Sequence, residues 1–168
     1  MIKKVILAIL LALPLSVFAQ GKFGVVDLQT VMSAMPEYTA MEQEMASASK
    51  QFEDEFTKLR EQADKLYADF QTLANDPQTA DAIKERRMQE VYESQEKIER
   101  FRNTAQQELA RKSEQLSAPI QAKMLEAIRT VGTEGGYTFI FPNEQGLLLY
   151  TGSNVENVTD KVKARLGL

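Results

Sequence analysis

The sequence predicts an α+β protein that is mostly helical, with a small β-rich body and a long antiparallel helical hairpin. Three observations support this fold class. Apolar residues between positions 36 and 73 recur every three or four residues, the segment after residue 79 repeats this spacing less regularly, and short β-prone runs lie near both ends. Such spacing indicates amphipathic helices, and short runs of β-branched and aromatic residues indicate strands.

The first long helix is predicted from Pro36 to Leu73. Pro favours the first helical turn, and no later Pro or Gly interrupts the segment. Its apolar spacing is near 3.5 residues, as in a coiled coil, with one stutter between Phe52 and Phe56. At about 1.5 Å per residue the helix is roughly 60 Å long, which exceeds the width of a compact domain of this size. We therefore expect an arm rather than a core helix.

The arm is predicted to reverse at Asn75–Pro77 and to return over about residues 79–116. Asn tolerates the left-handed conformation after a helix, Asp can cap the next helix, and Pro suits its first position. The returning seam is less regular, because Gln95, Arg102 and Lys112 occupy positions where a heptad would place apolar residues. We expect these polar residues to weaken the packing and to let the arm flex.

The N-terminal part of the body is predicted to hold a strand at Phe23–Val26 and a short helix at Leu28–Met35. The carboxylate of Asp27 is placed to cap that helix. After the arm, Pro119 is predicted to break or kink the return helix, with Ser117 as a new cap.

The C-terminal part of the body is predicted to hold a β-hairpin. Residues 137–141 alternate as a strand, residues 142–146 are typical of a turn, and residues 147–150 form the expected partner strand. A last helix over about 160–166 follows the cap candidates Asn157 and Thr159.

The predicted organisation is a signal peptide at 1–19, a β-rich oligomerisation body at 20–35 and 117–168, and the arm at 36–116. Lys3 and Lys4 precede an apolar run that is too short for a permanent membrane anchor. The sequence Val17-Phe18-Ala19 suits cleavage after Ala19. We expect an exported, periplasmic protein, and the absence of Cys excludes both disulfides and a lipidated cysteine.

The body is predicted to be stable only as an oligomer. Three short strands leave open edges and little apolar material for an independent core. A sheet shared between subunits would solve both problems. The residues expected in the shared strands are Phe23, Val25, Tyr137, Phe139, Phe141, Leu147 and Leu149.

Composition argues against catalysis, cofactors and nucleic acid as a partner. The chain has no His and no Cys, so the usual bases, thiol nucleophiles and soft-metal ligands are missing. No glycine-rich loop opens a helix as in a phosphate site. Without Lys3 and Lys4 the chain has 18 basic and 24 acidic residues, and a net charge of −6 disfavours nucleic-acid binding. We expect a protein that is not an enzyme, with no cofactor and no metal.

Several large apolar residues of the arm lie beside the seam or fit its register badly. They widen the contact between the two helices, or they form a second apolar face that binds unfolded chains. Met and Tyr suit such a face, because Met repacks readily and Tyr tolerates water at one end. The expected client-contact residues are Tyr67, Phe70, Met88, Tyr92 and Phe101.

The order of these segments resembles the Skp/OmpH family of periplasmic chaperones. The resemblance lies in residues 23–29 and 35–37, in 101–109 and 117–120 of the second half, and in the closing segments around Gly136-Tyr137, 147–150 and 158–160. It implies a homotrimer whose pooled strands form a small barrel, with three helical arms enclosing a cavity.

The resemblance further implies an ATP-independent holdase that keeps unfolded outer-membrane β-barrel proteins from aggregating. This acidic chain departs from the strongly basic best-known members, which puts electrostatic capture of clients and contact with anionic membrane surfaces in doubt. The alternative function is a structural coiled-coil adaptor or spacer of the envelope, whose arm binds one folded partner.

Overall fold

The computed structural model describes residues 21–144 and 147–168, which fall into two compact units. One unit, the helical hairpin, spans Met35–Lys123. The other, the sheet unit, contains residues 21–34 and the described part of Met124–Leu168. The predicted signal peptide lies outside the described residues, and the expected boundaries lay at residues 35/36 and 116/117.

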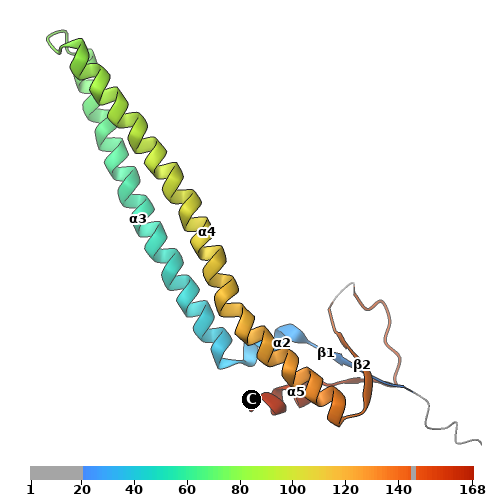
Figure 1. The fold of residues 1–168 in the computed structure, drawn as a ribbon. Coiled ribbons are helices and arrows are strands. Elements are labelled where there is room, and N and C mark those ends of the chain that lie inside the picture. Colours follow the sequence, from blue (N-terminus) through green and yellow to red (C-terminus); the bar gives the residue numbers. More distant parts are fainter. Residues whose placement is uncertain (1–20, 145–146) are drawn as a thin grey trace, which may run out of the picture. The chain divides into compact units, whose positions relative to one another are not determined.

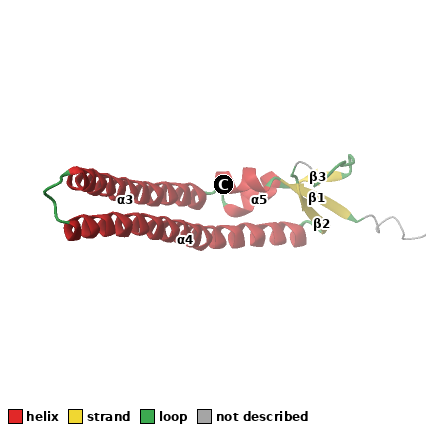
Figure 2. Cartoon of the chain, turned by 90° about the horizontal axis from the view of Figure 1, so that it is seen from above, coloured by secondary structure: helices red, strands yellow, loops and turns green. Residues whose placement is uncertain are grey.

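The mostly helical α+β fold class is confirmed. Two long helices account for most of the described chain, and a single small sheet lies in the sheet unit (Figure 2). None of the helices in the described ranges has an apolar stretch of the length that a membrane crossing needs. The elements are β1 (Lys22–Val26), α2 (Leu28–Ala34), α3 (Pro36–Asn75), α4 (Asp81–Glu134), β2 (Tyr137–Pro142), β3 (Val155–Asn157) and α5 (Thr159–Leu166).

In the helical hairpin, α3 and α4 run side by side and are joined by a short turn (Figures 1 and 2). The prediction of a long helix from Pro36 is confirmed, with Pro36 in the first turn. Few of its side chains are fully covered, because each helix has only one neighbour within the unit. The well-buried seam positions between the two helices are Ala48, Leu59, Val91, Ala105 and Ile120.

The turn at the tip differs from the prediction at each of its three residues. Asn75 still belongs to α3 and does not adopt a left-handed conformation. The Asp76 carboxylate accepts hydrogen bonds from the Gln78 backbone N–H at 2.9 Å and from the Thr79 hydroxyl at 2.9 Å. It therefore closes the turn instead of capping α4, which begins five residues later at Asp81. Pro77 likewise lies in the turn.

Pro119 does not break α4, so the expected new helix and its Ser117 cap are wrong. The Ser117 hydroxyl donates to the Glu114 carbonyl at 3.3 Å, which is a contact within the helix. Ile120, which directly follows the proline, is buried. We attribute the continuity to this packing, because a proline costs a helix one hydrogen bond and tertiary contacts can offset that loss.

The sheet is parallel throughout, with the order β2-β1-β3. The predicted β-hairpin between residues 137–141 and 147–150 is therefore wrong: β2 pairs with β1, and residues 147–150, with Leu147 and Leu149, form no strand. β1 contains the most buried run of the sheet, Gly24–Val26, which favours the central position. The other edge of β1 pairs with β3, a strand that the sequence did not predict.

The core of the sheet unit lies between its sheet and its helices. Its fully buried members are Val26 in β1, Val31 in α2, and Val158 and Val162 at the start of α5. Met124, Ala127 and Val131 of α4 are also buried. Periodic apolar positions on three separate helices thus contribute to the core beside one small sheet.

Side-chain hydrogen bonds join the ends of these elements: the predicted Asp27 cap is confirmed, whereas α5 begins after Val158, which makes no side-chain capping hydrogen bond. The Asp27 carboxylate accepts the Thr30 N–H at 2.8 Å, and this hydrogen bond holds its pKa below the usual range. The Asn157 side-chain oxygen accepts the Thr159 N–H at 3.0 Å at the start of α5. The buried Thr159 hydroxyl accepts the Asp27 N–H at 3.0 Å, which ties α5 to the end of β1.

Candidate functional site

Three of the predicted client-contact residues are exposed on the hairpin. The exposed fractions are 49% for Tyr67, 42% for Met88 and 55% for Tyr92. Large apolar side chains exposed to this degree within a few helical turns are unusual in a coiled coil, where the outer positions are polar. We call these three residues the tyrosine flank.

The tyrosine flank lies on one side of the hairpin. Met88, Tyr92 and Gln95 are spaced by four and three residues, so they form one row along α4. Tyr67 of α3 shares a groove of about 350 Å³ with Gln95 and Val91. The row and the groove therefore belong to the same side of the helix pair.

The opposite side of the hairpin has a hollow of similar size but different lining. This second groove measures about 370 Å³, and its lining includes the apolar residues Leu59 and Leu66. Its other lining residues are all polar or charged: Gln62, Glu90, Glu93, Ser94 and Lys97. The groove beside Tyr67 is also lined by the charged residues Arg60 and Asp64, so the two sides differ in the exposed side chains of the tyrosine flank and not in the size of their grooves.

The other two predicted contact residues are half-buried. Phe101 packs against Phe52 of α3, with ring centroids 6.0 Å apart and planes tilted by 58°. Phe70 occupies a seam position of α3. The structure therefore brings Phe101 into the contact between the helices and leaves the tyrosine flank outside it.

The three polar interruptions of the return helix have different surroundings. Gln95 lines the groove of the tyrosine flank, and Arg102 is exposed with its guanidinium 4.0 Å from the Glu99 carboxylate. Lys112 instead crosses the seam, with its Nζ 2.6 Å from Oε1 of Glu44. None of these three residues places an apolar side chain in the seam. Of the three, only Lys112 contacts α3 through an ion pair.

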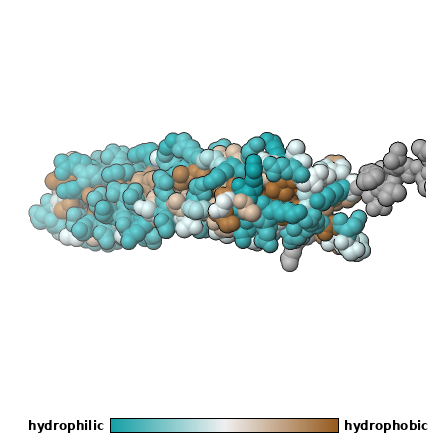
Figure 3. All heavy atoms as spheres, turned by 90° about the horizontal axis from the view of Figure 1, so that it is seen from below, coloured by the Kyte–Doolittle hydropathy of each residue, from teal (hydrophilic) through white to brown (hydrophobic). Residues whose placement is uncertain are grey.

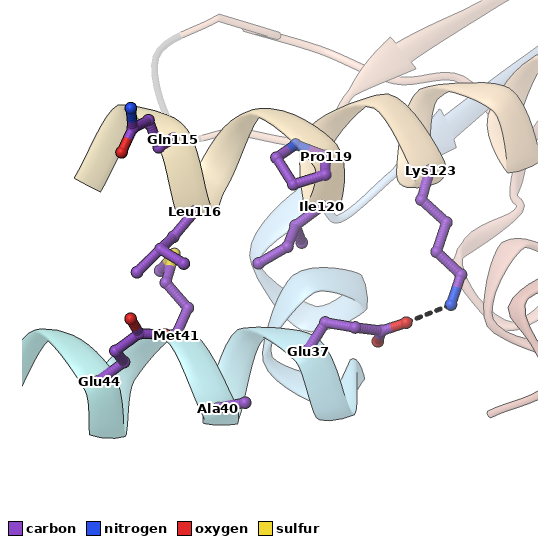
Figure 4. A pocket seen from close by; sticks show the side chains of 9 residues that line it. All are labelled: Glu37, Ala40, Met41, Glu44, Gln115, Leu116, Pro119, Ile120 and Lys123. Carbon is purple, nitrogen blue, oxygen red and sulfur yellow. Dashed lines mark hydrogen bonds and ion pairs between the residues drawn. The ribbon is translucent and has the colours of Figure 1, made fainter. Parts of the chain in front are cut away.

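A third groove, of about 370 Å³, lies between the helices near residue 40 (Figure 4). Met41 and Leu116 point toward one another across it, and Ile120 points toward α3 (Figure 4). Lys123 forms an ion pair with Glu37 at one end. We call this hollow the base groove; its full lining is Glu37, Ala40, Met41, Glu44, Gln115, Leu116, Pro119, Ile120 and Lys123.

The sheet unit exposes an aromatic face. Phe23 of β1 stacks on Phe139 of β2, with centroids 6.2 Å apart and planes only 6° apart. Phe141 lies 5.8 Å from Phe139, and 57% of Phe139 is exposed. Val25 pairs with Phe141 in the register, so it belongs to the same face. Tyr137 departs from this face, because a bulge lies between Lys22 and Phe23 and its ring lies close to Gly24 instead.

The remaining predicted strand residues lie in the segment between β2 and β3. Leu147 is exposed, 94% of Leu149 is exposed, and the neighbouring Tyr150 is 87% exposed. Nothing within the described chain covers these side chains. Exposed apolar runs of this kind are typical of interaction surfaces.

The comparison with protein families agrees with this architecture. The model of the family described as "Outer membrane protein (OmpH-like)" matches residues 22–166. The chain belongs to the OmpH-like family. No curated protein sequence matches the chain significantly.

Family membership confirms the resemblance drawn from the order of segments. The OmpH-like family supports a general role as a chaperone of outer-membrane proteins in the periplasm, and it is not a family of enzymes. Within residues 21–144 and 147–168, no group of three or more acidic residues is arranged to hold a metal ion.

The surface of this OmpH-like hairpin is mostly polar. On the face drawn in Figure 3, hydrophilic side chains cover most of the hairpin, and hydrophobic ones form separate patches among them. Exposed apolar groups are therefore a local feature of the hairpin.

One cluster in the sheet unit of this OmpH-like chain was missed by the sequence analysis. The Glu156 carboxylate lies 2.6 Å from Lys161 Nζ and 3.3 Å from Lys22 Nζ, and it accepts a hydrogen bond from the Tyr137 hydroxyl at 2.5 Å. The Lys161 and Tyr137 hydrogen bonds lower the pKa of Glu156 to about 2, and the Glu156 partner raises the pKa of Lys161. The cluster ties all three strands and α5, and no sequence spacing predicts it.

Proposed function

We propose that this protein is an ATP-independent holdase that binds unfolded outer-membrane β-barrel proteins in the periplasm and prevents their aggregation. The proposal narrows the general chaperone role of the OmpH-like family to one mechanism. It rests on the tyrosine flank, which offers exposed apolar side chains without a fixed complementary shape.

The tyrosine flank suits an unfolded client because its contacts are apolar and adaptable. Met88 repacks at little cost, while Tyr67 and Tyr92 offer a ring to apolar side chains and a hydroxyl to water or backbone. The groove beside Tyr67 leaves room for one large client side chain. Such contacts recognise apolar character and not a particular sequence, which is the requirement for many clients.

Holding by this mechanism needs no fuel. Many weak contacts lower the free concentration of aggregation-prone strands by mass action. The client leaves when insertion into the membrane offers a lower free energy. Flexing of the hairpin would accommodate clients of different size, and its sparse seam favours such flexing.

We further propose that the functional form is a homotrimer whose sheet units share their strands and whose hairpins enclose the client. The aromatic face of β1 and β2 supports this, because parallel sheets are normally covered on both faces. Leu147 and Leu149 supply further apolar surface for a neighbouring copy. Export with cleavage after Ala19 would deliver the chain to the periplasm.

A client-solubility assay with matched variants tests the holdase proposal. Unfolded outer-membrane protein is diluted from urea with wild-type chain, with a Tyr67→Ser/Tyr92→Ser variant, or with a Gln62→Ser/Glu93→Ser control on the opposite side. Two lost aromatic contacts should weaken client capture about tenfold, while the control should hold clients like the wild type.

Three outcomes distinguish the alternatives. Loss in the flank variant alone supports the proposal. Equal capture by all three proteins leaves the holdase in place but removes the tyrosine flank as its contact surface. Failure of the wild type with several clients, together with tight binding to one folded envelope protein, would favour the coiled-coil adaptor.

A further inference from the structure

Ion pairs are distributed unevenly along the helical hairpin. Residues 35–123 are all described, and most ion pairs among them join residues three or four apart on one helix. Only two connect α3 with α4: Glu44 with Lys112, and Glu37 with Lys123. Both lie at the base of the hairpin, and the half that ends in the turn has none.

The two cross-helix pairs bracket the base groove. Glu37 and Glu44 are seven residues apart and lie on the same side of α3, while Lys112 and Lys123 are three helical turns apart on α4. Glu37, Glu44 and Lys123 line the groove themselves. The hydrogen bond from Lys123 also lowers the pKa of Glu37 below its usual range.

The backbone hydrogen bonding of α4 is interrupted where the pairs occur. The base groove itself is similar in size to the two grooves farther along the hairpin, and Ala40 offers only a methyl group to its lining. Pro119 has no N–H, so the Gln115 carbonyl lacks its usual helical donor. Because α4 lacks one backbone hydrogen bond here, its position depends more on side-chain contacts with α3, including the two ion pairs.

We propose that Glu37–Lys123 and Glu44–Lys112 form an electrostatic clamp that holds the base of the hairpin closed and makes its opening sensitive to ionic strength. The remainder of the hairpin, which has no cross-helix ion pair, opens independently of salt. The base and the remainder of the hairpin therefore differ in how their opening responds to salt. This inference does not depend on which client the protein binds.

The size of the effect follows from the exposure of the pairs. All four side chains are partly exposed, and such pairs change an equilibrium by about two- to fivefold each. Screening shortens the range of these interactions from about 10 Å at 0.1 M salt to about 3 Å at 1 M. Because most helical stability in proteins comes from tertiary packing, an opened base exchanges its amide hydrogens faster.

Hydrogen exchange on the full-length mature chain tests the clamp. Exchange is measured at about 0.05 M and about 1 M NaCl, a range over which screening changes strongly. In the wild type, amides of residues 37–44 and 112–123 should exchange two- to fivefold faster at high salt, whereas residues 59–66 and 90–98 should not change.

Matched variants separate the clamp from a general loss of charge. Glu37→Gln/Glu44→Gln should exchange fast at the base at both salt concentrations. Glu96→Gln/Glu99→Gln removes the same charge from pairs within α4 and should behave like the wild type. The exchanged pair Glu44→Lys/Lys112→Glu keeps a cross-helix ion pair and should restore salt-sensitive protection relative to Glu44→Gln.

Two results would overturn the proposal. One is a salt response of equal size along the whole hairpin. The other is a base that retains its full salt response in Glu37→Gln/Glu44→Gln. Circular dichroism of each variant at low salt verifies equal helix content, so that a loss of folding cannot be mistaken for an open clamp.

Discussion

The helical hairpin and the sheet unit bury their side chains to different depths. In the sheet unit, Val26, Val31, Val158 and Val162 are almost completely removed from water. In the helical hairpin, only Met35, which precedes α3, is buried to this degree, and seam residues such as Leu59 and Val91 stay slightly exposed beside open grooves. The sheet unit thus has a core, while the hairpin is mostly surface.

Because of this difference, the two units are suited to different functions. A packed core resists change, because a lost contact there has no substitute. A two-helix seam has contacts that water can partly replace, so it tolerates bending and exposed apolar side chains. Features that bind a variable partner therefore belong on the hairpin, and features that fix an assembly belong in the sheet unit.

The strongest test of this comparison places a carboxylate in each unit. Val162→Asp puts a charge into the closed core and should lower the free energy of unfolding by more than about 3 kcal/mol. Val91→Asp places the same group beside the groove of the tyrosine flank, where it reaches water, and should cost about half as much. Urea unfolding followed by hydrogen exchange in each unit measures both. Equal losses would show that the hairpin seam is as closed as the core.

A smaller effect is expected where the two long helices end. α4 is followed by Gly136, whose φ of 66° is strained for other residues, whereas α3 ends without a left-handed residue. Gly136→Ala should therefore destabilise the sheet unit by about 1 kcal/mol. Asn75→Ala in the hairpin should leave thermal unfolding nearly unchanged. A stable Gly136→Ala protein would mean that the backbone there relaxes without strain.

The contrast between the units also explains what the sequence could predict. The bounds of α3 were predicted accurately, because a long seam repeats one local rule many times. The end of α4 was not predicted, because Pro119 was expected to interrupt a helix that continues to Glu134. The pairing of the strands was not predicted either, because the choice of β1 as the central strand depends on residues more than a hundred positions apart. Local turn chemistry favoured a β-hairpin after Phe141, and the burial of Val25 and Val26 outweighed it.

The candidate site was predictable only in part for the same reason. Periodicity identified residues beside the seam, yet it could not separate Phe101, which packs on Phe52, from Tyr92, which stays exposed. The base groove and its two cross-helix pairs depend on how α3 and α4 are aligned, and the heptad spacing of one helix does not define that alignment. The Lys112 that weakened the predicted seam proved to bridge it.

The smallest expected effect is on stability at low pH. It compares a carboxylate of the sheet unit, Glu156, with one of the hairpin, Glu96. In the sheet unit, the pKa of Glu156 is about 2 in the folded chain against an ordinary 4.5. Because the folded pKa is the lower one, its stabilising contribution is complete above about pH 4.5 and is lost as the pH falls toward 2. Glu156→Gln should therefore flatten the decline of Tm between pH 5 and 2 for the sheet unit. Glu96→Gln, whose partner Arg100 lies one turn away on α4, should leave that decline intact. If both variants follow the wild-type curve, the four-residue cluster does not hold β3 and α5 against the other strands.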